Sequence, residues 1–153
     1  MNGTTRGWNL KSATSATGAI IRDSGGNFIA ACCDSNDFAI DVAAMEASAL
    51  LAGLQLAEQF EAQSLVVESD SMEVVDAVHN PSDYRGSGAV IIDDCRQLLV
   101  GLGMATTQHC PREANMAAHV LARYGATQGA SFWFDDPPSF IIPVLVDDRV
   151  IIQ

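Results

Sequence analysis

The 153-residue sequence is poor in positive charge. It contains one lysine and seven arginines against 19 acidic residues, and its formal net charge is −11 at pH 7. The basic residues form no run. Nucleic-acid-binding proteins usually carry a basic patch, because contacts to phosphates supply most of their affinity. Any nucleic-acid binding by this chain must therefore use a local cluster of cations or metal ions.

The sequence also lacks the marks of membrane, secreted and zinc-binding proteins. No apolar run approaches the roughly 20 residues of a membrane span, and residues 1–8 have no apolar core of a signal peptide. None of the four cysteines belongs to a Cys-x-x-Cys pair, which argues against structural zinc and favours buried free thiols. We therefore expect a cytosolic or nuclear protein that does not bind membranes.

The composition is that of a globular protein, with 48% hydrophobic and 18% charged residues. A chain of this length can bury a sizeable core within one domain. We expect a single domain over residues 1–153, with a core over about 17–125 and a packed C-terminal extension over 126–153. The sequence does not indicate an oligomeric state.

A short apolar run, Leu65–Val67, ends abruptly in polar residues that include Asp70. Such a run is typical of a strand buried on both faces of a sheet. Asp70 then lies at the carboxyl end of a central strand, where open α/β sheets place their ligand sites. A second interpretation is that Asp70 and Glu73 form a capping box at the start of the next helix.

The longest helix is expected over residues 42–60 and carries Glu46. Small residues recur at every fourth position from Ala49 to Ala57, which would let this helix lie close to a sheet. Glu46 lies near the border of that face, and its pairing with Asp70 is the main functional indication. Glu46 alone also fits a first-turn carboxylate favoured by the helix dipole.

The expected elements follow the order hairpin, long helix, strand, two helices, strand and helix. Four segments in that order resemble ribonuclease H-like domains, most nearly their plant reverse-transcriptase-like branch, which occurs alone or at the end of retroelement polyproteins. These segments are Gly18–Phe28, Met45–Leu54, Val67–Ser71 and Arg112–Arg123. The resemblance implies an α/β fold in which helices flank a mixed sheet.

The resemblance also implies a chemistry, the hydrolysis of RNA in RNA–DNA hybrids by four acids that hold two metal ions. The helix acid of the family matches Glu46 and its strand-end acid matches Asp70, so both would be ligands of Mg²⁺ or alternatively Mn²⁺. The acid of the last helix is replaced by His119, a change usual in the plant branch. His119 would be an auxiliary catalytic residue, and the partner would be an RNA–DNA hybrid or another nucleic acid.

The first acid of the family lies on the central strand ahead of the hairpin, but this sequence has no Asp or Glu before Asp23. The segment Asn9–Ala16 resembles the loop after that strand, so residues 1–8 stand in its place. We therefore expect the first central strand to be missing or degenerate, either lost or replaced by a makeshift strand over Thr4–Leu10. Catalysis would then be impaired. The alternative is a non-catalytic nucleic-acid or protein interaction module that keeps the fold.

Overall fold

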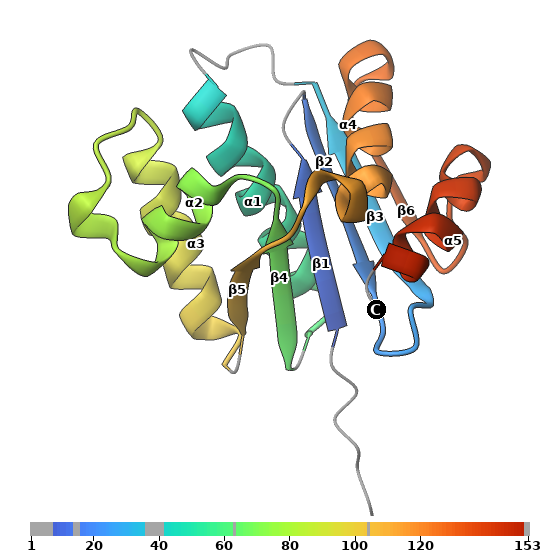
Figure 1. Ribbon diagram of the computed structural model, residues 1–153, viewed down its shortest axis with the longest axis horizontal. Helices are drawn as coiled ribbons and strands as arrows, with labels where there is room; N and C mark the ends of the chain where they lie inside the picture. The colour runs from blue at the N-terminus through green and yellow to red at the C-terminus, as the bar shows by residue number, and fades with distance from the viewer. Residues whose placement is uncertain (1–7, 14–15, 36–41, 63, 104, 152–153) are drawn as a thin grey trace, which may run out of the picture.

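The structure, a computed structural model, describes residues 8–13, 16–35, 42–62, 64–103 and 105–151. Its centre is a six-stranded mixed sheet in the order β5-β4-β1-β2-β3-β6 (Figure 1). Strand β1 runs parallel to β4, and β4 runs parallel to β5, whereas β1, β2, β3 and β6 pair in antiparallel fashion. The strands are β1 (Trp8–Ala13), β2 (Thr17–Arg22), β3 (Phe28–Asp34), β4 (Leu65–Ser69), β5 (Thr106–His109) and β6 (Ser131–Phe134).

Helices cover both faces of this sheet, which confirms the predicted α/β class (Figure 1). Helices α1, α2 and α3 pack on one face, and α4 and α5 pack on the other. None of the described helices is long and apolar enough to cross a membrane. The helical elements are α1 (Val42–Gln59), α2 (Met72–His79), η1 (Pro81–Asp83), α3 (Ala89–Gly101), η2 (Arg112–Asn115), α4 (Met116–Gln128), η3 (Ser139–Ile141) and α5 (Ile142–Ile151).

The central strand β1 is present and overlaps the strand that the sequence predicted. Trp8–Ala13 lies between β2 and β4, so the alternative of a lost strand is wrong. A substitute strand does fill the centre: residues 8–10 of the predicted Thr4–Leu10 belong to it, and residues 4–7 lie outside the described part. The prediction of a loop over Asn9–Ala16 is accordingly wrong for residues 9–13.

The burial of polar residues explains why β1 was misplaced. Leu10 is fully buried, but so are its neighbours Lys11 and Ser12. A central strand is normally a continuous apolar run, and this one interrupts that pattern with an ammonium and a hydroxyl. The strand is therefore degenerate in composition although it is complete in its pairing.

Glycines set how closely the helices approach the sheet. A Cβ atom on Gly53 of α1 would lie 2.8 Å from Leu10 Cδ1, which confirms the predicted small-residue contact. A Cβ atom on Gly125 of α4 would lie 2.9 Å from the carbonyl oxygen of Asp34. Gly125 is thus a packing residue inside α4, although a glycine at this point of a sequence is typical of a helix end. The helix is instead followed by Gly129, whose φ of 80° is the conformation that glycine favours.

All four cysteines are free thiols, as expected, and three of them are buried. Burial, with smaller contributions from nearby charges, raises the pKa of Cys32 and of Cys95 to about 12. Both therefore remain neutral thiols at physiological pH and behave as small apolar groups.

Candidate functional site

Asp70 follows the carboxyl end of β4, and its side chain reaches toward α4. The cap of the next helix is Ser71, whose Oγ accepts a hydrogen bond from the Val74 amide at 3.3 Å. The capping interpretation of Asp70 is therefore wrong. Its carboxylate is instead paired with His119, with Nε2 of the imidazole 2.6 Å from Oδ2. An imidazole protonated at Nε2 donates that hydrogen bond.

Contacts between β1 and the start of α4 fix the position of His119. The Lys11 ammonium donates a hydrogen bond to the Ala114 carbonyl, and Nδ2 of Asn115 donates one to the Ser12 carbonyl at 2.8 Å. These bonds hold η2 against the central strand. Because His119 lies one helical turn after Asn115, the same bonds position its imidazole over Asp70.

Glu46 reaches the same end of the sheet from the other face. It is the fifth residue of α1, and the first turn of that helix holds no acid, so the helix-dipole interpretation is wrong. The Ser71 hydroxyl donates a 2.6 Å hydrogen bond to Oε2 of Glu46. Ser71 follows Asp70 directly in the chain. The structure thus brings Glu46, Asp70 and His119 together around this turn.

Ser71 is the residue of this region that sequence reasoning missed. It caps α2 and tethers the carboxylate of α1, so one hydroxyl joins two elements. A sequence signal was available, because serine is a preferred N-cap residue and Ser71 directly precedes the helix. Asp70 competed for the same assignment in the sequence, since aspartate is also a favoured N-cap.

Electrostatics keep Asp70 ionised at neutral pH. Burial by itself raises the pKa of this carboxyl, but the hydrogen bond and charge of His119 oppose that effect. The Arg112 charge and an Asn115 hydrogen bond act in the same direction as His119, and the net result is a lowered pKa. A carboxylate that stays charged at this strand end is suited to attract a cation.

The central strand supplies no carboxylate beside Asp70. Ser12 lies opposite Ser69 at the end of the parallel register, and Ala13 and Asp70 are the residues that follow them in the chain. No residue of Trp8–Ala13 is acidic. Among the described residues, no group of three His, Cys, Asp or Glu side chains is placed to hold a metal ion.

The donors that are present fit a magnesium ion only in part. Two carboxylate side chains, Glu46 and Asp70, are hard oxygen donors of the kind that Mg²⁺ prefers. An octahedral ion held by these two groups would complete its shell with water and substrate phosphate, as Mg²⁺ commonly does. The two carboxylates are thus of the type that Mg²⁺ prefers, but no third described His, Cys, Asp or Glu side chain is placed with them to complete a site, and β1 adds no acidic ligand.

One arginine and two histidines lie near this edge in an otherwise acidic protein. Arg112 is exposed, and its charge acts on Asp70. His109 is also exposed and lies opposite Ser69 at the end of β5. Together with His119 they are side chains at this edge that can donate hydrogen bonds to phosphates.

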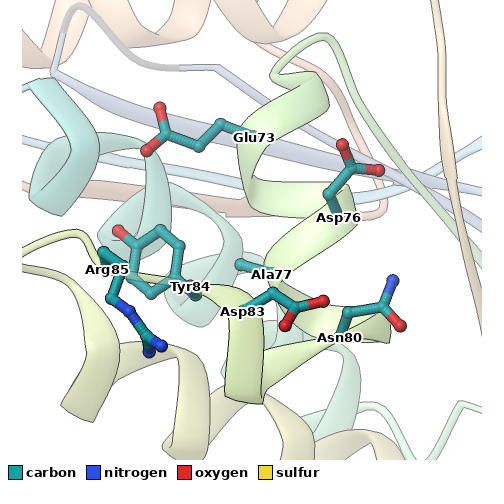
Figure 2. A pocket seen from close by; sticks show the side chains of 7 residues that line it. All are labelled: Glu73, Asp76, Ala77, Asn80, Asp83, Tyr84 and Arg85. Atoms are coloured by element: carbon teal, nitrogen blue, oxygen red, sulfur yellow. The ribbon is translucent and has the colours of Figure 1, made fainter.

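A hollow of about 630 Å³ lies elsewhere on the molecule and is lined mainly by acidic and polar residues (Figure 2). Its lining includes the carboxylates of Glu73, Asp76 and Asp83, with Arg85 as its single basic residue. These carboxylates would repel phosphate groups. The edge around Asp70 is therefore the better candidate for a phosphate-bearing ligand.

Comparisons with known proteins agree with this architecture. A family model described as reverse transcriptase-like matches residues 3–125. No curated protein matches the chain.

Solved structures share the fold at low sequence identity. RNase H1 from the halophilic archaeon Halobacterium salinarum NRC-1 is 22% identical, with a TM-score of 0.68 over 78% of this chain and 96% of that chain. The N-terminal RNase H domain of rv2228c from Mycobacterium tuberculosis is 17% identical, with a TM-score of 0.70 over 79% and 94% of the two chains.

A third similar structure is a foamy viral protease-reverse transcriptase in complex with an RNA/DNA hybrid. It is 11% identical, with a TM-score of 0.56 over 80% of this chain and 20% of that chain. With the family match, these likenesses show that the chain has the ribonuclease H-like fold and belongs to the reverse transcriptase-like family.

Proposed function

We propose that this domain binds RNA–DNA hybrids at the carboxyl ends of β1 and β4 and hydrolyses the RNA strand slowly with the aid of a divalent metal ion. The observation that carries the proposal is the convergence of Glu46 and Asp70 on the two sides of Ser71, next to His119. A similar structure, the foamy viral protein, is described in complex with an RNA/DNA hybrid, which supports the choice of ligand.

The residues divide into two groups by their chemistry. Glu46 and Asp70 would hold Mg²⁺ or Mn²⁺, and the bound ion would supply Lewis-acid activation of water and charge stabilisation at the phosphate. His119 holds a proton at Nε2 beside Asp70 and keeps this carboxylate oriented. The exposed Arg112 and His109 would bind backbone phosphates, where positive charge supplies most of the affinity.

The slow rate follows from the composition of β1. Ala13 follows Ser12 as Asp70 follows Ser69, so a carboxylate at this position of the central strand is the one that would join the other two. Without it, the protein offers few ligands and little charge to hold a second ion. Two-ion catalysis normally stabilises both the attacking and the leaving oxygen, so the loss of one ion lowers the rate of cleavage.

The test is the variant Ala13→Asp, compared with Ala13→Asn as a control of similar size without the charge. The substrate is a labelled RNA–DNA hybrid in magnesium buffer. We expect Ala13→Asp to cut at least ~10-fold faster than wild type, which corresponds to about 1.4 kcal/mol of transition-state stabilisation, and Ala13→Asn to match wild type. Equal rates for the two variants would show that β1 does not border the reacting phosphate.

The second candidate is a non-catalytic nucleic-acid-binding module. It is favoured by the Asp70–His119 contact, which occupies one carboxylate oxygen that a metal would otherwise use. The two functions differ in their response to metal. For the enzyme, Mg²⁺ or Mn²⁺ raises the melting temperature of the wild type but not of Asp70→Asn. For the module, neither protein responds, and hybrid binding persists when the metal is chelated.

A further inference from the structure

Strand β6 forms one edge of the sheet and pairs only with β3 among the described strands. An edge strand leaves a row of backbone N–H and C=O groups open to another strand. Natural proteins usually block such an edge with lysine, proline or a bulge. The sequence of Ser131–Phe134, Ser-Phe-Trp-Phe, contains no lysine or proline, and its pairing with β3 runs without a register shift.

Two of the three aromatic side chains of β6 face solvent. Phe132 is 45% exposed and Phe134 is 58% exposed, and their ring centroids lie 5.6 Å apart. Phe60, just after α1, lies 6.3 Å from Phe132 and extends the group. Trp133 points to the other face of the sheet and packs against Tyr124. Phe132 and Phe134 are therefore aromatic side chains that the core does not bury.

A cavity of about 180 Å³ adjoins these rings, between α1 and the strands β3 and β6. Its apolar lining includes Cys32, Leu56 and Phe132, and its polar lining includes the exposed carboxylate Asp34. This combination fits a long aliphatic stem that ends in a positive charge. Lysine and arginine have that shape, and they also stack favourably on aromatic faces.

The charges around the rings select the kind of partner. Neither α1, β3 nor β6 contains a lysine or an arginine. Exposed acids flank the aromatic group in sequence, namely Asp34, Glu58, Glu61, Asp135 and Asp136. A second copy of the chain would bring these acids against their own counterparts, and a nucleic acid would be repelled. A basic segment is electrostatically complementary.

We propose that the β6 edge binds an extended basic peptide as an added strand, with one lysine or arginine side chain crossing the Phe132 ring to reach Asp34 in the cavity. Strand addition supplies backbone hydrogen bonds, and pockets for alternate side chains supply specificity. Three strands separate β6 from β4, so this surface is distinct from the Asp70 site. The inference does not rest on the proposed nuclease function.

The test is fluorescence anisotropy with a labelled synthetic peptide of alternating valine and lysine residues. An alternating valine and glutamate peptide is the charge control, and a valine and lysine peptide N-methylated at every second amide is the pairing control. Asp34→Asn and Phe132→Ser remove the two contacts that define the site. Glu73→Gln on α2 removes the same charge elsewhere on the exposed surface.

We expect the basic peptide to bind, Asp34→Asn to weaken it at least ~3-fold and Phe132→Ser at least ~10-fold, in line with cation–π and aromatic contact energies. Glu73→Gln should leave the affinity unchanged, and N-methylation should abolish binding. The proposal is overturned if no binding occurs up to about 1 mM, if Asp34→Asn and Glu73→Gln behave alike, or if N-methylation has no effect. Wild-type dimers that Phe132→Ser dissociates in sedimentation would also overturn it, because a second copy would then occupy the edge.

Discussion

Replacing Gly18 with alanine is expected to push α4 away from the sheet and to break the contact between Asp70 and His119. The added Cβ would lie 2.3 Å from the carbonyl oxygen of Ala118 and 2.5 Å from the amide nitrogen of Ala122. Both are backbone atoms, so no side chain can rotate away. Ordinary non-bonded contact lies at about 3.5 Å, and α4 must therefore withdraw by about 1 Å.

The magnitude of this change follows from overpacking. Extra groups in a packed core cost about 1–3 kcal/mol, and a clash with backbone belongs at the upper end of that range. His119 is the neighbour of Ala118 on the same helix, so a withdrawal of about 1 Å stretches its present 2.6 Å contact to Asp70 beyond hydrogen-bond range. Urea unfolding should measure the lost stability, and NMR titration should show a raised pKa of Asp70.

Gly101→Ala is the matched control. A Cβ atom on Gly101, the last residue of α3, has no heavy atom within 4 Å. Alanine also has a higher helix propensity than glycine, so this variant should be as stable as wild type or up to about 1 kcal/mol more stable. The reasoning is refuted if Gly18→Ala unfolds within about 0.5 kcal/mol of wild type, or if the Asp70 titration is unchanged.

Two further predictions concern the polar groups at this end of the sheet. Because the pKa of Asp70 is lowered in the folded state, its carboxylate stabilises the fold above the unfolded value of about 3.9, and this contribution is lost as the pH falls through the folded pKa. Asp70→Asn should therefore flatten the fall in unfolding free energy below about pH 4, and an unchanged urea profile would contradict this. Lys11→Met leaves the Ala114 carbonyl without the Lys11 donor and should cost about 1–3 kcal/mol, whereas a variant as stable as wild type would show that the bond contributes nothing.

The parts of the fold that the sequence predicted well are those with continuous local patterns. The hairpin of β2 and β3 has turn residues between two apolar runs, and the structure confirms it with an antiparallel pairing. Helix α1 has an apolar face and small residues at regular spacing, and it ends within one residue of the prediction. Strand β4 is a buried apolar run, and it places Asp70 at its carboxyl end.

The parts that failed depend on contacts between residues far apart in the chain. The ammonium of Lys11 is tolerated in a central strand because the Ala114 carbonyl, 103 residues later, accepts its hydrogen bond. In the sequence, Gly125 suggests a helix end. Only the assembled fold shows that the Asp34 backbone packs against it. Neither partner can be identified from the local pattern.

Lys11, the buried charged residue that interrupts the apolar pattern of β1, also affects the chemistry of the site. Asn9 and Lys11 share one face of β1, because side chains alternate along a strand. Lys11 and Ala13 lie two residues apart, which is about 7 Å along the strand. A metal ion beside Ala13 would experience the buried ammonium at that range, with a repulsion of about 2 kcal/mol per unit charge at an effective dielectric constant of about 20. An acid restored at Ala13 must overcome this repulsion, so a graft that replaces both residues should bind the ion more tightly than Ala13→Asp alone.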